Sequence, residues 1–280
     1  MRIETALKKA QNILRNQNFK SANLDCEILL SKVLGKDRKY IILNPKKKLE
    51  NYELTYFNSL IKERSYGKPI AYLTEKKYFW DTEFLIKKDV LIPRPDTEII
   101  IEQALKFNKN KSKQRILDIG VGSGCILLSL LKEKKDFYGT GIDKSEKCIS
   151  LSQINAQRLG LTNRVKFFKS DIDNFSNGKY DLIISNPPYI NKYDLKYLDK
   201  GIASFEPKLA LNGGLDGLSE IRKIIKKSSE LIKENGRFIL EIGYDQKNKV
   251  KSLLINKGFY INKVVKDLAK NDRCIVSTKI

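Results

Sequence analysis

The sequence predicts an α/β protein in which an N-terminal helical-bundle domain precedes a mostly parallel sheet with helices on both faces. From about residue 93 to residue 280, short apolar runs typical of buried strands alternate with helical patterns. This alternation favours parallel strands joined by crossover helices. Before residue 76, apolar residues recur at helical spacing instead. The length of 280 residues exceeds one ordinary domain and agrees with this division.

Residues 1–75 are predicted to form a helical domain. Three stretches carry apolar residues at the spacing of one helical face, and Gly35 and Asn44-Pro45 separate them. No cluster of acids or nucleophiles appears in this segment, so we expect it to recognise a substrate, with a plain accessory domain as the alternative. The apolar positions are Ile3, Leu7, Ala10 and Leu14, then Leu24, Ile28, Leu29 and Val33, then Leu54, Phe57, Leu60 and Ile61.

Residues 76–92 are predicted to form a linker that contains a β-hairpin. Its strands are expected over residues 83–86 and 90–92, with Lys87–Asp89 as the turn. Two prolines follow and break the chain.

The α/β domain, residues 93–280, is predicted to begin with a helix over residues 97–108. Asp96 or Thr97 is expected to cap this helix, because short polar side chains satisfy the free N–H groups of a first turn.

A strand over residues 116–119 leads into a glycine-rich turn, Gly120-Val121-Gly122-Ser123-Gly124, and a helical pattern follows. Glycines at such a turn let the backbone approach a ligand closely at a helix N-terminus. The spacing is GxGxG, whereas dinucleotide folds carry GxGxxG. It therefore favours S-adenosylmethionine over a nicotinamide cofactor.

Acids end the next two predicted strands. Asp143 follows the strand over residues 137–142, and Asp171 follows the strand over residues 165–168. A carboxylate at the end of the second strand suits the two hydroxyls of a ribose, and Asp171 with Ile172 is placed to edge an adenine ring. Taken alone, each acid is more typical of a helix cap or a solvated charge. The succession of these groups at strand ends indicates a nucleoside site.

The fourth predicted strand, residues 180–185, ends at Asn186, Pro187, Pro188 and Tyr189. Open α/β sheets bind their ligands at the carboxyl ends of such strands. Two prolines have no N–H and a fixed φ, so their carbonyls are held still and stay free to accept. The Asn186 carbonyl and the Tyr189 ring complete a loop that suits a planar NH2 group. A simple proline turn is the alternative for these four residues alone.

Two late strands, residues 237–242 and 259–264, are predicted to flank a helix over residues 245–257, and a last run covers residues 273–278. Further segments complete a recognisable pattern, of which Leu91–Glu98 is the most specific. The others are Gly67–Thr74, Phe79-Trp80, Phe205–Pro207, Gly213–Leu218, Glu241–Gln246 and Asn271–Arg273.

With these segments the chain resembles the class I S-adenosylmethionine-dependent methyltransferases, and more closely the HemK/PrmC family of peptide chain release factor glutamine methyltransferases. The resemblance covers nearly the whole chain. Related ribosomal-protein glutamine methyltransferases carry Arg-Ser-Pro where this chain has Arg94-Pro95-Asp96. Two positions depart from the family pattern. Glu75 stands where glycine is usual. The segment after Arg273 reads Cys274-Ile275-Val276, where a second valine or small residue is more usual.

The resemblance implies a Rossmann-like, mostly parallel seven-stranded sheet whose last run, residues 273–278, is an antiparallel edge strand. It also implies N5-methylation of the glutamine in the Gly-Gly-Gln loop of release factors, with S-adenosyl-L-methionine as cofactor. The expected cofactor-binding residues are Gly120, Val121, Gly122, Ser123, Gly124, Asp143, Asp171, Ile172 and Asn186. The expected catalytic residues are Asn186, Pro187 and Tyr189, and the expected substrate-binding residues are Asn186, Pro187, Pro188 and Tyr189.

The chemistry expected of this loop follows from the amide nucleophile. The lone pair of an amide nitrogen is delocalised into its carbonyl, so the protein must position the nitrogen and favour charge appearing on it. The Asn186 side-chain carbonyl and the Pro187 backbone carbonyl would accept its two hydrogens, while Tyr189 stacks on the amide and Pro188 locks the loop. The alternatives are a ribosomal-protein glutamine methyltransferase, an adenine-N6 nucleic-acid methyltransferase, which would need a base-flipping module, and a non-enzymatic cofactor-binding regulator.

Composition narrows the class of protein further. The net charge of +21 invites a phosphate-rich partner, but 43 lysines stand against 11 arginines, and arginine is the residue that planar base and phosphate recognition favours. We therefore expect a solvated lysine surface and no direct nucleic-acid substrate. The absence of histidine excludes a histidine base, metal ligand or triad.

The four cysteines are far apart, without a CxxC pair, and are expected to be buried free thiols, not a metal site or a disulfide frame. No apolar run reaches about 18 residues, and the N-terminus lacks the apolar stretch of a secretory signal. We therefore expect a cytoplasmic monomer without membrane contact.

Overall fold

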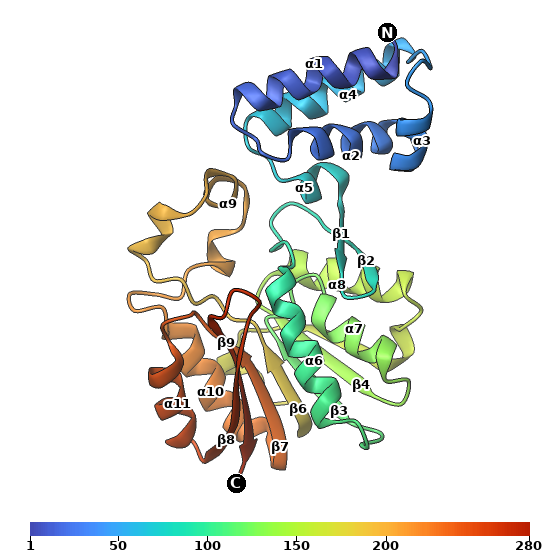
Figure 1. Ribbon diagram of the computed structural model, residues 1–280. Coiled ribbons are helices and arrows are strands. Elements are labelled where there is room, and N and C mark those ends of the chain that lie inside the picture. Colours follow the sequence, from blue (N-terminus) through green and yellow to red (C-terminus); the bar gives the residue numbers. More distant parts are fainter. The chain divides into compact units, whose positions relative to one another are not determined.

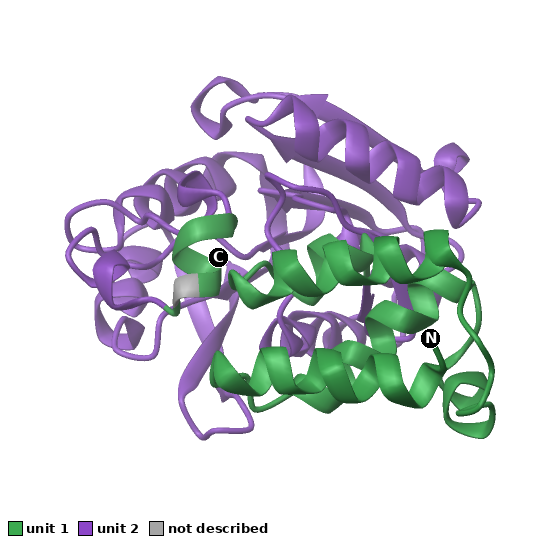
Figure 2. Cartoon of the chain, turned by 90° about the horizontal axis from the view of Figure 1, so that it is seen from above, with its two compact units in different colours: residues 1–76, 199–205 green, residues 77–198, 206–280 purple. Residues whose placement is uncertain are grey.

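The computed structural model describes residues 1–199 and 201–280 with their side chains and contains two compact units (Figure 1). The first unit comprises residues 1–76 together with residues 199–205, and the second comprises residues 77–198 and 206–280 (Figure 2). The short segment 199–205 joins the first unit although it lies far along the chain. No sequence pattern predicted this assignment.

Helices make up the first unit, as the apolar spacing predicted. They are α1 (Ile3–Asn16), α2 (Ala22–Leu34), α3 (Arg38–Leu43), α4 (Asn51–Ser65), α5 (Ile70–Thr74) and α9 (Lys200–Phe205). Helix α1 buries the predicted Ile3, Ala10 and Leu14, and α4 buries the predicted Phe57, Leu60 and Ile61.

The buried face of α2 differs from the predicted one. Leu24 is 42% exposed, whereas Cys26 and Leu30 are fully buried. The inward face also carries Asp25, whose Oδ2 accepts a hydrogen bond of 2.8 Å from Nε of Arg64 on α4. Because burying this ion pair turns Asp25 inward, the adjacent Leu24 turns out to solvent.

A seven-stranded sheet forms the centre of the second unit, with the order β5-β4-β3-β6-β7-β9-β8. The first five strands in this order pair in parallel, while β9 pairs antiparallel with both of its neighbours. The predicted mostly parallel seven-stranded sheet is therefore confirmed. The strands are β3 (Arg115–Ile119), β4 (Tyr138–Asp143), β5 (Val165–Lys169), β6 (Tyr180–Ser185), β7 (Ile232–Glu241), β8 (Phe259–Lys266) and β9 (Asp272–Lys279).

The helices of the second unit connect these strands. From β3 the chain steps outward through β4 to β5, and it then returns to β6 and steps the other way. Right-handed crossovers in opposite directions place α7 and α8 on one face and α10 and α11 on the other. The helices are α6 (Glu98–Phe107), α7 (Cys125–Glu133), α8 (Glu146–Arg158), α10 (Ser219–Leu231) and α11 (Lys247–Ile255) (Figure 1).

The predicted edge position of the last strand is wrong. Strand β9 lies between β7 and β8, and β8 is the edge. Residues 274–278 of β9 are buried in succession, as suits a strand covered on both faces. By contrast β8 exposes Tyr260 and carries Lys263 and Lys266, and charged side chains are typical of an edge strand.

The predicted hairpin is displaced along the chain. The observed strands are β1 (Lys76–Phe79) and β2 (Thr82–Leu85), and Trp80 takes a φ of +53° in the turn between them. Residues 90–92 form no strand. Instead, the Ile92 N–H lies 3.3 Å from a carboxylate oxygen of Glu206. This side-chain acceptor replaces the ladder partner that a hairpin strand would need.

The Glu75 departure falls at a left-handed backbone position. Glu75 follows the last residue of α5 with a φ of +61°. Glycine adopts this conformation without strain, and it often ends helices in this way. The turn into β1 therefore keeps the glycine-type conformation despite the glutamate.

Two other features bear on the composition-based expectations. The four cysteines are buried and free. Among residues 1–199 and 201–280, none of the helices combines the length and apolar character needed to cross a bilayer.

Candidate active site

A cavity of about 590 Å³ opens at the carboxyl edge of the parallel strands in the second unit. The polar groups predicted at the ends of β3, β4, β5 and β6 meet there, as the topology of an open α/β sheet requires. Of the predicted site residues, those on the cavity wall are Gly120, Val121, Gly122, Ser123, Asp143, Asp171, Ile172, Asn186, Pro187 and Pro188. Gly124 and Tyr189 lie outside this wall.

Gly120 and Gly122 leave the cavity floor open. Both have positive φ values, +78° and +56°. A Cβ at Gly120 would meet no atom within 4 Å, and one at Gly122 would meet only the Gly120 carbonyl oxygen, at 4.0 Å. The backbone at these positions is thus bare toward the cavity. Gly124 differs, because a Cβ there would lie 2.9 Å from Cδ1 of Leu128. Its role is to let the turn pack on α7.

Asp143 fastens the glycine turn to the end of β4. Its Oδ2 accepts from the Gly122 N–H at 3.1 Å, and its Oδ1 accepts from the Ser145 N–H at 2.9 Å. Burial raises the pKa of this carboxyl, and the two backbone hydrogen bonds oppose the rise. Each carboxylate oxygen has further lone pairs, so Asp143 can also accept from hydroxyl groups in the cavity.

Asp171 and Ile172 stand at the end of β5. The Asp171 side chain accepts from the Asp173 N–H at 3.2 Å and so caps the short 3-10 helix η3 (Ile172–Asn174). Asp171 therefore has the capping role that is typical of an isolated acid, and it also lines the cavity. Ile172 is buried and lines the cavity with its apolar side chain.

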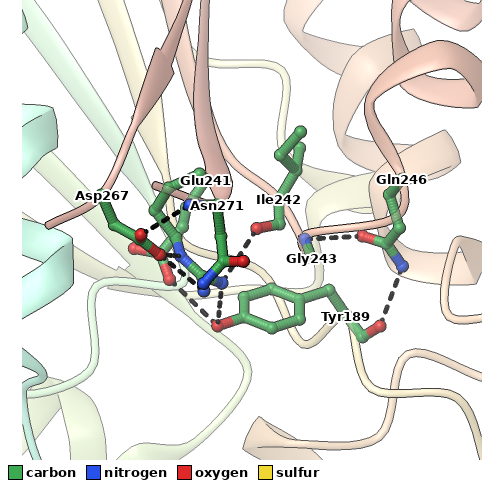
Figure 3. A network of polar contacts seen from close by, with 8 residues as sticks. Tyr189, Glu241, Ile242, Gly243, Gln246, Asp267 and Asn271 are labelled. Carbon is green, nitrogen blue, oxygen red and sulfur yellow. Dashed lines mark hydrogen bonds and ion pairs between the residues drawn. The ribbon is translucent and has the colours of Figure 1, made fainter. Parts of the chain in front are cut away.

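The Asn186–Tyr189 loop is held at both ends. Nδ2 of Asn186 donates to Oγ1 of Thr97 at 3.0 Å. At the other end, Nε2 of Gln246 donates to the Tyr189 carbonyl at 2.9 Å (Figure 3). It also donates to the Gly217 carbonyl at 3.1 Å. The two prolines between these anchors line the cavity. The loop is a fixed element of the wall.

Tyr189 belongs to a polar network beneath the loop (Figure 3). Its hydroxyl donates to Oε1 of Glu241 at 3.2 Å, and the Arg273 guanidinium lies 5.9 Å from its ring centroid. Arg273 in turn pairs with Asp267 at 3.0 Å. Burial and the Glu241 carboxylate raise the pKa of the Tyr189 hydroxyl. The ring thus lies beside the cavity and supports the loop from below.

Thr97 does not cap helix α6, in contrast to the prediction for Asp96 or Thr97. Neither residue makes a side-chain cap hydrogen bond there, and the Thr97 side chain is buried and turned to Asn186. The segment before it is fixed by Arg94, whose Nη2 lies 2.5 Å from Oε1 of the buried Glu206. The Thr97 side chain bonds to Asn186 instead of capping α6, because the first turn of α6 lies beside the Asn186 loop.

Sequence reasoning missed a fully buried acid, Asp118, on strand β3. Neither of its carboxylate oxygens has a hydrogen-bond partner among the described residues. Burial raises its pKa to about 8, and the nearby Asp143 adds to the rise. The available signal was one acid within the apolar run Ile116–Ile119.

Two polar residues of α8 that sequence reasoning also missed hold the glycine turn from behind. Oγ of Ser152 donates to the Gly122 carbonyl at 2.9 Å, and Nδ2 of Asn155 donates to the Ser123 carbonyl at 2.9 Å. Asn155 also bonds both backbone groups of Leu85 in β2. Their signal was a pair of small polar residues three positions apart on a helix that packs against the turn.

Comparison with known proteins decides the family. Residues 5–74 match the model of the PrmC N-terminal domain, and residues 97–216 match that of the methyltransferase small domain. A release factor glutamine methyltransferase of Clostridium acetobutylicum is 38% identical over 282 residues, which cover 100% of this chain and 99% of that protein. One of Buchnera aphidicola subsp. Baizongia pistaciae is 40% identical over 279 residues, with full coverage of both. The chain belongs to the release factor glutamine methyltransferase family.

A solved structure supports the fold of this release factor glutamine methyltransferase family member. The ribosomal protein L11 methylase from Lactobacillus delbrueckii subsp. bulgaricus superposes with a TM-score of 0.51 at 17% identity, over 73% of this chain and 90% of that one. At this identity the likeness shows the fold alone. The resemblance inferred from the motifs is confirmed by the family match.

The cofactor of a release factor glutamine methyltransferase, S-adenosylmethionine, fits the residues present. The bare backbone at Gly120 and Gly122 leaves room for a ligand that a Cβ would fill. Asp143 offers carboxylate lone pairs, and Ile172 offers an apolar surface on the same cavity. These are the groups that a ribose and an adenine ring need.

Proposed function

We propose that this protein transfers a methyl group to the side-chain nitrogen N5 of the glutamine in the Gly-Gly-Gln loop of a peptide chain release factor. The observation that carries the proposal is that Asn186 and Pro187, which offer a side-chain and a backbone carbonyl as acceptors, both lie on the wall of the cavity that the glycine turn also lines. The names of the curated relatives support the choice of a release factor as substrate.

The cofactor supplies an electrophilic methyl group on a sulfonium, so the protein has to prepare the nucleophile. A glutamine amide donates two hydrogens in one plane. The Asn186 carbonyl and the Pro187 carbonyl would accept these hydrogens and hold the nitrogen toward the methyl group. In a transfer that forms the nitrogen–carbon bond and breaks the sulfur–carbon bond of the sulfonium, S-adenosylhomocysteine would leave, and the two carbonyl dipoles would stabilise the positive charge that appears on the nitrogen. One N–H proton then leaves to water.

The prolines and Tyr189 serve this geometry in different ways. Pro187 and Pro188 fix the backbone of the loop, because each has a locked φ. Tyr189 supports the loop through its hydroxyl bond to Glu241 and its contact with Arg273. We assign Tyr189 to positioning of the loop, which replaces the stacking contact expected from the sequence.

The helical domain of residues 1–75 is proposed to recognise the release factor outside the Gly-Gly-Gln loop. The match of residues 5–74 to a domain model characteristic of this family supports the assignment. Several large apolar side chains of this unit stand in solvent, among them Ile42 at 59% and Leu43 at 66% exposure. We further propose that the enzyme acts as a cytoplasmic monomer on protein, with no nucleic-acid substrate.

The deciding experiment is transfer of labelled methyl to a purified release factor, with ribosomal protein, RNA and DNA as competing substrates. Mass spectrometry of the Gly-Gly-Gln peptide should show one added methyl on the glutamine side chain. A release factor with this glutamine replaced by glutamate is the matched control and should take up no label. Methyl found only on adenine or on a ribosomal protein would reject the proposal.

A further inference from the structure

The Asn186 side chain can work in only one of its two orientations. Its amide has a donor end, Nδ2, and an acceptor end, Oδ1. The proposed function, on which this inference rests, needs the acceptor end to face the substrate N–H. In the structure Nδ2 donates to Oγ1 of Thr97 at 3.0 Å. The nitrogen is thereby held to one side, and Oδ1 is left for the substrate.

Thr97 can impose this orientation only while its own hydroxyl hydrogen points elsewhere. A hydroxyl can donate one hydrogen and accept others. If that hydrogen turned to Asn186, the hydroxyl would attract Oδ1 and favour the flipped amide. A second acceptor near Thr97 would hold that hydrogen away from Asn186, and the Thr97 side chain is only 2% exposed, so such an acceptor has to come from a buried neighbour.

The carboxylate of Glu241 can serve as this acceptor. It is 1% exposed at the end of β7, and its Oε1 accepts from the Tyr189 hydroxyl at 3.2 Å. Its other oxygen, Oε2, has no hydrogen-bond partner within the described part of the chain. Thr97 interacts with this carboxyl, since it is the main group that lowers the pKa of Glu241 against the effect of burial, but Oε2 and the Thr97 hydroxyl are not hydrogen-bonded in the structure.

We propose that Thr97 and Glu241 are positioning residues, which together set the orientation of the Asn186 amide so that its carbonyl oxygen faces the substrate nitrogen. An ionised carboxylate can only accept, so it draws the Thr97 hydrogen to itself. The Thr97 oxygen is then free to accept from Nδ2. Three segments far apart in sequence, η1 (Pro95–Thr97), the Asn186 loop and β7, supply these three residues. The Asn186–Thr97 hydrogen bond is present in the structure, and the hydrogen bond from Thr97 to Glu241 is part of the proposal.

The charge state of Glu241 should therefore matter. Burial raises its pKa to about 7, and the charged groups that face it are Arg273 from β9, which opposes the rise, and Asp96 from η1, which adds to it. Tyr189 and Cys274 also face it, but burial raises the pKa of both above their usual alkaline values. Neither of them changes its charge near pH 7. Protonated Glu241 can donate to Thr97, and this donation removes the preference.

The test compares Thr97→Val, which keeps the side-chain shape and loses the hydroxyl, with the control Thr97→Ser, which keeps the hydroxyl. Substrates are a Gly-Gly-Gln peptide and S-adenosylmethionine. For Thr97→Val we expect kcat to fall about 10²-fold, as for a misplaced reacting group, with peptide KM and cofactor Kd within threefold of wild type. Thr97→Ser should keep kcat within about fivefold, since its hydroxyl makes the same bonds.

The pH profile gives a readout that a merely structural role would not move. In wild type, kcat should decline as pH falls through about 7. Glu241→Gln should lose this limb, because its amide does not titrate in this range. This variant also keeps the inference testable if Thr97→Val does not fold.

Each outcome decides a separate point. A Thr97→Val enzyme with wild-type kcat, or an unchanged acid limb in Glu241→Gln, would overturn the positioning role. Equal loss in Thr97→Val and Thr97→Ser, together with lost cofactor affinity, would show a structural role and also overturn it. If wild type adds no methyl to the glutamine of the peptide or of an intact release factor, the proposed function fails, and the inference that rests on it fails with it.

Discussion

Replacing Asp118 by asparagine should change how the stability of the protein depends on pH. Asp118 is fully buried, and neither oxygen has a hydrogen-bond partner among the described residues. Its pKa is raised from 3.8 to about 8. Between these values the folded chain holds a proton that the unfolded chain releases. The stability that this proton confers is complete below pH 4 and is lost as pH rises through about 8.

The size of the effect follows from proton linkage. Where the folded state binds one proton more than the unfolded state, the free energy of unfolding falls by about 1.4 kcal/mol for each unit by which the pH rises. Over the whole shift this amounts to about 6 kcal/mol, because each pKa unit corresponds to about 1.4 kcal/mol. Glu241, with a pKa raised to about 7 from 4.5, adds a similar slope below pH 7. Between pH 7 and pH 8, Asp118 contributes more than Glu241 to the pH dependence of the free energy of unfolding.

The measurement is urea unfolding of wild type and Asp118→Asn at pH values from 5 to 8, in the absence of cofactor. Asparagine has nearly the same shape and carries no titrating proton. The free energy of unfolding of the variant should therefore fall less steeply with rising pH than that of wild type, by about 1.4 kcal/mol per pH unit. Glu241→Gln should flatten the curve only below pH 7, and the exposed Asp173→Asn should leave it parallel to wild type. Parallel curves for wild type and Asp118→Asn would refute the reasoning.

Three further predictions concern the site and the helical unit. Gly122→Val should raise the Kd of S-adenosylmethionine at least tenfold, about 1.4 kcal/mol, because a branched side chain is strained at a φ of +56° and fills open space in the cavity; unchanged affinity of a folded variant in calorimetry would exclude this pocket. Asn186→Gln should lower kcat about 10²–10³-fold, whereas Asn186→Asp, which keeps one acceptor at the same place, should retain more activity; equal activity of Gln and Asn would show that this residue does not position the substrate. Ile42→Ser combined with Leu43→Ser should raise KM for an intact release factor about tenfold and leave KM for the isolated peptide unchanged, and an equal change for both substrates would argue against a docking role.

The sequence predicted the site best where the chemistry lies at the ends of strands. Apolar runs that end at turn residues identified β3, β4, β5 and β6, and the topology of a parallel sheet then brings their carboxyl ends together. The glycine turn, Asp143, Asp171 and Asn186 therefore lie around one cavity, as predicted. The positions of such groups can be predicted from the sequence, because each position is set by the strand that precedes it.

The sequence could not reveal groups whose roles depend on partners elsewhere in the chain. Thr97 was predicted to cap a helix, because local pattern cannot show that Asn186 lies within hydrogen-bond reach. Leu24 was predicted to lie on the apolar face of α2, because local pattern cannot show that the adjacent Asp25 pairs with Arg64 of α4. The order of β8 and β9 also depends on which strand pairs with β7, and pairing partners leave little trace in a strand's own residues.

The course of the chain through the two units has a consequence for how the protein can be divided. Because residues 199–205 belong to the first unit, the backbone passes between the units after residue 76, after residue 198 and after residue 205. A single proteolytic cut after residue 76 therefore leaves the segment 199–205 of the first unit joined to the second unit, and a cut after residue 198 or 205 leaves residues 1–76 joined to it. A fragment that ends at residue 76 also lacks Phe205, whose ring approaches Gly67 in the intact unit. The helical unit is thus connected to the second unit by three passages of the chain, and the last of these leads directly into Glu206, the partner of Arg94.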